Sequence, residues 1–441
     1  MVSGCRGGIM TGLAMLGLLG LTRAVVAAGE PAGPAGEPKT ELPVPALPFY
    51  KVKAPPLPPP TGKVVEVKNV EELLAACAAP AEGSTILIAD GTYQLTRGLW
   101  LTGLKGVTLR GKSGERTRAV LDGTKVAKGE ILTLGSNCAD VTIADLTVQN
   151  AAVHGITVKG EGNNQRPRIY NCRLRDCWER YVKGTAIPNP DGKDAAGLAP
   201  EVLKTRPAGG RIEFCLFEQS HPKTADDWTG GDYLAGLDLM WLKDWVISDN
   251  VFLNLQGKTR GGRGAVFVWN NSEDVLIERN LIVNCDRGIC LGNPSGAAVH
   301  LTRGVVRNNF VVRGADKAIE LARTRDCQVY HNTVWSAEPG YARTLHLFDG
   351  SRGARVFNNL VGGKLLVEGP DAGKVESNLS GALDGFFADP AKGDLHLTPK
   401  GAAAARGKGQ PVPQGTADFD NRPRPPVPAL GASEPEAAPA P

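Results

Sequence analysis

Cationic side chains gather at one point of the chain where they could catalyse proton abstraction. Lys258, Arg260 and Arg263 lie close together, just before the apolar run Ala265–Trp269. A lyase that acts on a uronate sugar needs a cation to neutralise the substrate carboxylate and a base to remove the acidified C5 proton. Lys258 or His221 is the candidate base, and Arg260 and Arg263 are the candidate carboxylate-binding residues. The alternative is that these charges belong to a solvated glycine turn.

Carboxylates form a second cluster, a little upstream. Asp226, Asp227 and Asp232 follow His221 within one short stretch. In glycosidases, two carboxylates flank the scissile bond at a separation of about 5–5.5 Å or about 6.5–9.5 Å. Carboxylate oxygens are also the ligands that Ca²⁺ prefers. Asp226 and Asp227 are therefore candidate metal ligands and Ca²⁺ is a candidate cofactor, although the sequence establishes no cofactor.

Tryptophan is concentrated in the same part of the chain, with five of the seven Trp residues between positions 178 and 269. Indole faces can stack on sugar rings, whereas a Trp in a core needs a partner for its N–H. Anchoring of loops is thus the alternative to sugar binding. The candidate substrate-binding residues are Trp228, Trp241, Trp269, Arg180 and Lys183.

A recurring short pattern indicates the scaffold that positions these residues. An apolar residue, any residue, a polar residue, Asn, any residue and an apolar residue recur six times, and the last copy lacks its final apolar residue. The key residues are Asn250, Asn280, Asn309, Asn332, Asn359 and Asn378, and Cys172 and Cys215 occupy the same slot upstream. Each period holds two or three short β-branched runs, which cannot bury an apolar face without stacking on their neighbours. The sequence predicts an all-β fold, a single-stranded right-handed parallel β-helix of about ten coils with a structural Asn ladder.

Two further features bound this helix. Asn69 and Glu72 form a capping box for a helix over 69–78, which we expect to cover the N-terminal edge. The repeat spacing is longest across residues 178–245, where insertions should become loops on one face. We therefore predict a groove between these insertions and the strand Ala265–Trp269.

The ends of the chain differ in composition from the middle. Residues 1–28 read as a secretory signal peptide, 29–60 as a stiff Pro-rich spacer, 61–400 as the β-helix and 401–441 as a Pro-rich, partly disordered segment. A net charge of +4 over 441 residues argues against a dedicated nucleic-acid binder. We expect a secreted, periplasmic or cell-surface monomer with no transmembrane segment after signal cleavage. Most of the eight cysteines after residue 28 should be buried free thiols.

Residues 84–400 resemble the right-handed β-helix proteins of the pectin-lyase-like superfamily. The usual C-terminal finish of that family is matched by Phe387–Pro390, Asp394–Leu397, Asp418–Pro423 and Leu430–Glu434. The resemblance implies an exported protein that acts on, or binds, polysaccharides. Of the motifs of pectin-degrading hydrolases only Asp226-Asp227 is matched, and Gly-His-Gly is absent.

The rhythm of Val266–Asn293 is similar to that of β-helix alginate and chondroitin lyases. Where those enzymes carry their base and carboxylate-neutralising residues, this chain has Val266–Ser272 and Ile289–Asn293. A lyase of this kind must therefore use other residues. We predict an exported carbohydrate-active protein that cleaves an acidic polysaccharide by β-elimination. The alternative is a non-catalytic glycan-binding or structural protein of the cell surface.

Overall fold

The computed structural model describes residues 41–127, 129–187, 197–224, 226–227, 231–312, 317–336, 343–348, 350–412 and 416–436. The chain divides into two compact units, Met1–Lys39 and Thr40–Pro441. The first unit, with the predicted signal peptide, lies outside the described residues. Everything below concerns the second unit.

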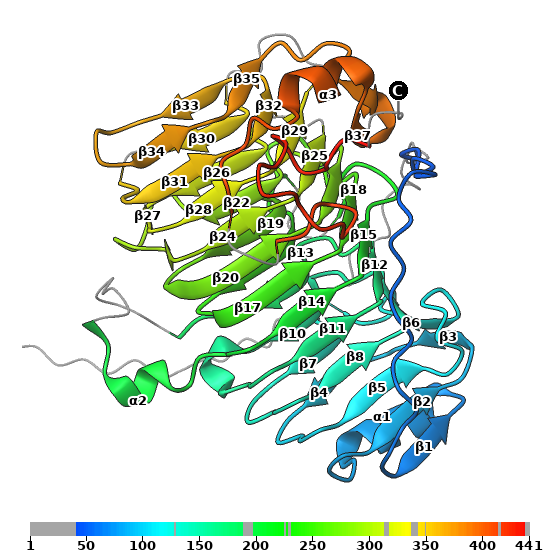
Figure 1. Cartoon of the computed structure of the whole chain (residues 1–441). Helices are drawn as coiled ribbons and strands as arrows, with labels where there is room; N and C mark the ends of the chain where they lie inside the picture. The colour runs from blue at the N-terminus through cyan, green and yellow to red at the C-terminus, as the bar shows by residue number, and fades with distance from the viewer. Residues whose placement is uncertain are drawn as a thin grey trace, which may run out of the picture. The chain divides into compact units, whose positions relative to one another are not determined.

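Short strands of this unit stack into three parallel sheets, and successive strands along the chain pass from one sheet to the next (Figure 1). Sheet A contains β1 Val64–Val67, β2 Thr85–Ile88, β5 Thr108–Gly111, β8 Thr142–Ala144, β11 Arg168–Tyr170, β14 Arg211–Glu213, β17 Lys243–Ser248, β20 Ser272–Glu278, β23 Leu301–Thr302, β24 Val305–Arg307, β27 Thr324–Arg325, β28 Gln328–Tyr330, β31 Ala354–Phe357 and β34 Gly373–Glu376. Sheet B contains β3 Gly91–Gln94, β6 Ala119–Asp122, β9 Thr147–Gln149, β12 Arg173–Arg175, β15 Leu216–Glu218, β18 Val251–Leu253, β21 Leu281–Val283, β25 Phe310–Val312, β29 Thr333–Trp335, β32 Leu360–Gly362 and β35 Leu379–Gly381. Sheet C contains β4 Leu99–Leu101, β7 Leu132–Leu134, β10 His154–Val158, β13 Arg180–Gly184, β16 Ala235–Met240, β19 Gly264–Trp269, β22 Ile289–Gly292, β26 Ile319–Ala322, β30 Leu345–Leu347 and β33 Leu365–Val367.

The remaining elements are few and short. They are the helices α1 Val70–Ala78, α2 Pro200–Leu203 and α3 Pro399–Ala405, the 3₁₀ turns η1 Gly160–Gly162 and η3 Pro390–Lys392, and the antiparallel pair β36 Phe387–Asp389 and β37 Asp394–Leu397. The coiled parallel architecture confirms the predicted β-helix.

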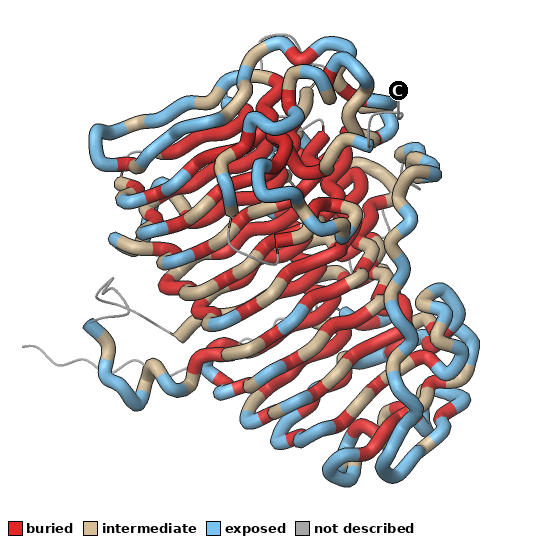
Figure 2. Tube along the Cα trace, in the orientation of Figure 1, coloured by how far each residue is buried: buried red, intermediate tan, exposed pale blue. Residues whose placement is uncertain are grey.

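The core runs along the inside of the stack because alternate residues of each strand point inward. On β16 and β19, for example, Leu237, Leu239, Val266 and Val268 join one continuous apolar cluster. Figure 2 shows this buried interior as a band that passes through every coil. Residues between these positions, such as Asp238, point to the outer face.

The predicted Asn ladder is confirmed at the corner between sheets A and B. Successive members are joined from Nδ2 to Oδ1 at 2.9–3.0 Å, through Asn250, Asn280, Asn309, Asn332, Asn359 and Asn378. Upstream, the backbone N–H of Cys215 donates to Asn250 Oδ1 at 2.9 Å, and the N–H of Cys172 lies 3.4 Å from Cys215 Sγ. The eight described cysteines are all buried and free, as expected.

The helix α1 caps the N-terminal end of the stack, and the C-terminal part of the chain covers the outer face of sheet B. Asn69 caps α1 by accepting the N–H of Glu72 at 2.8 Å, and Leu73 and Cys77 of this helix are buried. The helix α3 and residues 416–436 pack on the outer face of sheet B, where Phe419 stacks on Phe310 with ring centroids 3.9 Å apart. Proline-rich composition alone does not predict this packing.

Residues 41–60 form an extended N-terminal strap that lies along the outside of the coils (Figure 1). Asn254 donates to the carbonyl of Pro43 at 3.1 Å, and the Tyr170 hydroxyl donates to the carbonyl of Pro55 at 2.6 Å. The segment is extended, as the prolines predict, but it is bound to the body of the helix.

The predicted insertions lie at opposite ends of the strands of sheet C. One leaves β13 and leads through α2 to β14, and the other connects β15 to β16 through residues 219–234. The strands β13, β16 and β19 are therefore the part of sheet C that both insertions flank.

Candidate functional site

A buried carboxylate organises the outer face of sheet C between the insertions. Asp238 on β16 is 1% exposed. It accepts from Arg180 Nε at 2.5 Å, from Lys183 Nζ at 2.9 Å and from Trp269 Nε1 at 2.8 Å. The parallel register makes these contacts possible, because Lys183 is paired with Asp238 and Trp269 with Met240 on neighbouring strands. Three of the residues that the sequence proposed for substrate binding thus meet at one acidic group.

The charges in this cluster favour each other's ionised forms. Burial opposes the charged form of Asp238, but the charges of Lys183 and Arg180 outweigh burial and hold its pKa below the usual value. Asp238 is therefore a poor proton acceptor. Tyr233, half exposed, covers Arg180, with the guanidinium carbon 3.7 Å from the ring centroid. Cations, a carboxylate and an aromatic ring together make a surface suited to a charged, ring-shaped ligand.

Lys223, in the insertion before β16, brings a third basic group to the same place. Its side chain is buried at 2% exposure, and Nζ donates to the carbonyl of Tyr233 at 3.3 Å. Burial and the nearby charge of Arg180 lower the pKa of Lys223 to about 8. Tyr233 therefore links Lys223 to Arg180, and Lys223 can release its proton close to neutral pH.

A histidine lies between two carboxylates on the adjoining strand, β10. His154 Nδ1 is 3.0 Å from Glu130 Oε1, and Nε2 is 3.4 Å from Glu179 Oε1. Burial disfavours the imidazolium, but hydrogen bonds to Glu130 and Glu179 raise the pKa of His154 overall. Burial opposes ionisation of Glu130 as well, yet its bonds to His154 and Thr133 bring its pKa down to about 2. Charged side chains therefore continue from β16 across β13 to β10.

The arginines that the sequence proposed for catalysis contact carboxylates other than Asp238. Arg260 Nε donates to Asp286 Oδ1 at 2.8 Å, and Arg263 lies 3.7 Å from Glu320. Lys258 is exposed. The two arginines thus contact different carboxylates.

The residues that the sequence proposed between positions 221 and 228 do not share a common contact in the part of the chain that the structure describes. His221 stacks on Trp178 with ring centroids 4.5 Å apart. Asp227 accepts the N–H of Thr224 at 2.7 Å, which closes a turn, and Asp226 is exposed. Trp228 lies outside the described residues.

Trp241 does not join the cluster on sheet C. It is buried at 1% exposure in the turn between β16 and β17, under the guanidinium of Arg206, whose carbon is 4.6 Å from the ring. Within the residues that the structure describes, no three His, Cys, Asp or Glu side chains are grouped to hold a metal ion. The Ca²⁺ site at Asp226 and Asp227 stays a prediction.

Sequence reasoning missed Asp238, Lys223 and Tyr233 as members of the cluster. A signal for Asp238 was present, because it is the one charged residue in the alternating run Ala235–Met240 and so falls on the outer face. Lys223 and Tyr233 come from an insertion without periodicity, where no comparable signal exists.

Comparisons with known proteins give information about the fold of the chain. A family model described as periplasmic copper-binding protein (NosD) matches residues 202–366. The pectate lyase Pel9A is 14% identical with a TM-score of 0.53, over 82% of this chain and 90% of the lyase. The likeness to Pel9A and the three parallel sheets show that the chain folds as a right-handed parallel β-helix.

Two other solved β-helix structures resemble the chain less closely by TM-score. An alginate lyase from Paenibacillus sp. str. FPU-7 is 14% identical with a TM-score of 0.48, over 70% of this chain and 98% of that enzyme. The PL6 family alginate lyase AlyGC is 14% identical with a TM-score of 0.45, over 72% of this chain and 51% of that enzyme. No curated protein matches the sequence. At such identities the likeness concerns the fold, which by itself does not fix an activity.

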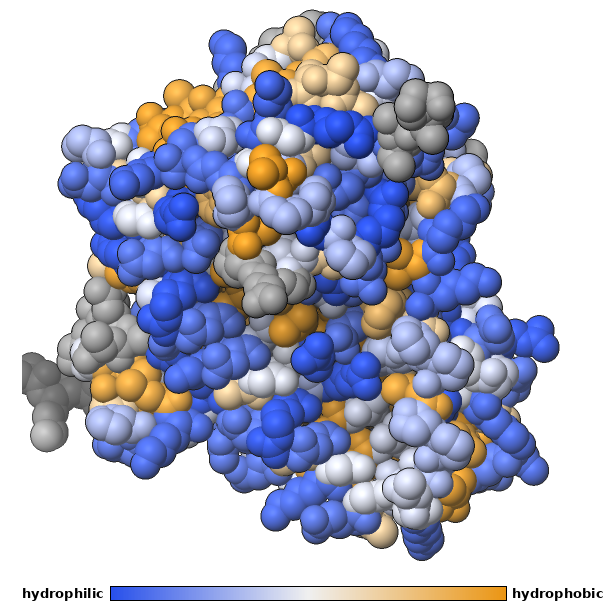
Figure 3. Space-filling model, in the orientation of Figure 1, coloured by the Kyte–Doolittle hydropathy of each residue, from blue (hydrophilic) through white to orange (hydrophobic). Residues whose placement is uncertain are grey.

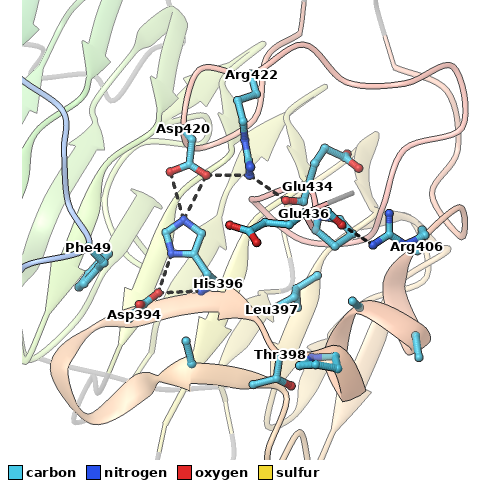
Figure 4. A pocket seen from close by; sticks show the side chains of 15 residues that line it. Phe49, Asp394, His396, Leu397, Thr398, Arg406, Asp420, Arg422, Glu434 and Glu436 are labelled. Carbon is cyan, nitrogen blue, oxygen red and sulfur yellow. Dashed lines mark hydrogen bonds and ion pairs between the residues drawn. The ribbon is translucent and has the colours of Figure 1, made fainter. Parts of the chain in front are cut away.

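The C-terminal finish of this β-helix protein contains a second charged cluster, shown in Figure 4. His396 lies between Asp394, 2.6 Å from Nδ1, and Asp420, 3.1 Å from Nε2, while Arg422 donates to Asp420 at 2.8 Å. Burial disfavours the imidazolium, but the two carboxylates raise the pKa of His396 to about 9. These residues line a cavity of about 810 Å³ that also includes Phe49 of the strap. Their bonds join β37 to the C-terminal segment.

The surface of this β-helix protein is otherwise mixed in character. The face in Figure 3 is largely hydrophilic, with separate small apolar areas. Among the described residues, no helix is both long and apolar enough to cross a membrane.

Proposed function

We propose that the protein is exported, binds an acidic polysaccharide across the outer face of sheet C and cleaves it by β-elimination. The observation that carries the proposal is the contact of Tyr233 with both Lys223 and Arg180. It places a basic amine of lowered pKa beside a guanidinium that can bind a carboxylate. Likeness to polysaccharide lyases at fold level, and a family model described as periplasmic, support this direction.

The chemistry assigns separate roles to the cations. Arg180 and Lys183 carry more N–H donors than their bonds to Asp238 use, so they can also bind a uronate carboxylate. Neutralising that carboxylate makes the C5 proton more acidic. Lys223, as the neutral amine, accepts this proton, the electron pair forms the C4–C5 double bond and the C4–O bond breaks. The departing oxygen takes up a proton from water.

An activity assay tests this assignment. The chain without residues 1–28 is incubated with alginate, pectate and chondroitin, with and without Ca²⁺, and unsaturated products are followed by ultraviolet absorbance. We expect the rate to rise with pH towards about 8 as Lys223 loses its proton. Lys223→Met should lower the rate by a factor of about 10² or more, the usual contribution of a general base. Lys374→Met, which changes an exposed lysine on β34, is the matched control.

A lyase rate that Lys223→Met leaves unchanged would show that another group is the base. Absorbance that never rises in any of the substrates would exclude elimination from them.

A second function is favoured by the burial of the cluster itself. Arg180 is 2% exposed and Lys183 8% exposed, and both are bound to Asp238. Such a cluster suits a non-catalytic protein that binds glycan at the cell surface through its outer rim. Binding on a glycan array by a protein that is silent in the absorbance assay would favour this alternative.

A further inference from the structure

An exposed tryptophan lies at the N-terminal end of the same face, away from the Asp238 cluster. Trp100 is the central residue of β4, between the buried Leu99 and Leu101, and therefore points outward. Its side chain is 62% exposed. Exposure on this scale leaves a large apolar ring in water without a contribution to the core.

The neighbouring coil is shaped to receive this ring. Gly135 follows β7, the next strand of sheet C, and a Cβ at Gly135 would lie 2.5 Å from Trp100 Nε1 and 2.9 Å from its Cε2. One edge of the indole therefore rests over bare backbone. Any larger residue at position 135 would displace the ring.

A cation completes the arrangement from the coil after that. Lys159 follows β10, and its Nζ lies 5.5 Å from the centroid of the Trp100 ring. The same ammonium is 3.3 Å from Glu130, which also contacts His154. Trp100 is thus connected to the charged side chains that lead across sheet C to Asp238.

We propose that Trp100 is a stacking platform for a sugar ring of the acidic polysaccharide, at a subsite remote from Lys223. The proposal rests on the function proposed above. The apolar face of a pyranose ring fits an exposed indole, and a uronate carboxylate fits Lys159 beside it.

The position of Trp100 sets the length of chain that can reach both places. β4 and β13 are three strand steps apart in sheet C, with β7 and β10 between them. At about 4.8 Å per step this is about 14 Å. A pyranose unit in an extended glycan is about as long as one step. The outer rings of a trisaccharide are then about two steps apart, so a trisaccharide can occupy only one of the two places, whereas an octasaccharide can span both.

Affinity measurements with oligosaccharides of two lengths test the subsite. Trisaccharides and octasaccharides of pectate and of alginate are titrated by calorimetry in a Lys223→Met background, which prevents cleavage. We expect Trp100→Ala to weaken octasaccharide binding about tenfold and to leave trisaccharide binding unchanged, because stacking adds to affinity only where the chain reaches the ring. Trp100→Phe should retain part of the affinity.

Gly135→Ala offers a second way to disturb the platform without removing the ring. The atoms that the new methyl group meets belong to two exposed side chains, Trp100 and Thr102, which can move aside, so the fold should survive. Val375→Ala, at an exposed apolar residue of sheet A, is the control. An octasaccharide affinity that stays within about twofold in Trp100→Ala would overturn the subsite alone. Failure of the parent protein to bind any of the four oligosaccharides would overturn the proposed function and the subsite together.

Discussion

The Asn ladder and the outer face of sheet C are both columns of polar side chains that run from coil to coil, but they are built differently. Each interior member of the ladder repeats the same contacts, as Asn280 does when it bonds Asn309 and the carbonyl of Ile247. On sheet C, Lys183, Asp238 and Phe267 are register partners with no chemistry in common. A contact that every coil repeats stabilises the stacking of coils. A contact that occurs in a single coil is not needed for stacking.

The two columns also differ in charge. The ladder consists of neutral amides, each of which satisfies buried backbone groups of adjacent coils. The sheet C cluster instead buries two cations on one carboxylate and lowers the pKa of that carboxyl group. Burying charges costs more than burying amides, so the cluster is the costlier of the two to maintain. That difference is the physical reason to assign function to sheet C.

Asp238→Ala should have the largest effect on stability. It leaves Arg180 and Lys183 buried without their shared carboxylate, and the loss of one partner of a buried ion pair costs about 3–5 kcal/mol. Chemical denaturation of the mutant and parent proteins measures the difference. Asp371→Ala, which removes an exposed ion-pair partner of Arg352, is the control and should cost well under about 1 kcal/mol. An unfolding midpoint unchanged by Asp238→Ala would contradict the account of the cluster.

Removal of an interior ladder residue should cost somewhat less. Asn309 is fully buried, and its side chain bonds two other ladder residues and two backbone carbonyls. Asn309→Ala should lower the free energy of unfolding by about 3 kcal/mol, because several buried groups lose partners at once. Asn378→Ala, at the half-buried last member, should cost less than half as much. The same denaturation series compares the two, and equal losses at both sites would argue against cooperation along the ladder.

The ladder could be predicted from sequence because its spacing and residue type repeat. The sheet C cluster was found only in part, for a reason that lies in register. Arg180, Lys183 and Trp269 were each proposed from residue type, but they are connected by Asp238, more than fifty positions beyond Lys183. The length of the repeat does not show which residues of two coils become neighbours when an insertion of unknown conformation lies between the coils.

Arg260 shows that residue type alone does not identify the partner of a charged side chain. Its type and its neighbours suggested carboxylate binding, and it does bind a carboxylate, but that of Asp286 in the next coil. Lys258 is exposed, while Lys223, which received no role from its sequence, is buried against Tyr233. Exposure and partner choice depend on the fold of loops, which follows no repeat.

Cys215→Asn should give the smallest effect and the sharpest test of what the ladder requires. Cys215 already occupies the ladder slot, where its N–H donates to Asn250 and its sulfur receives the N–H of Cys172. An Asn of similar size would place Oδ1 near the Cys172 N–H and Nδ2 near Asn250 Oδ1, which extends the ladder by one coil. We expect the free energy of unfolding to rise by about 0.5–1 kcal/mol, the net value of an added hydrogen bond. Cys285→Asn is the control, since Cys285 is equally buried but lies outside the slot, and there the polar group should destabilise the protein. If both substitutions destabilise the protein equally, the slot is defined by its packing around sulfur and not by the amide contacts that repeat downstream.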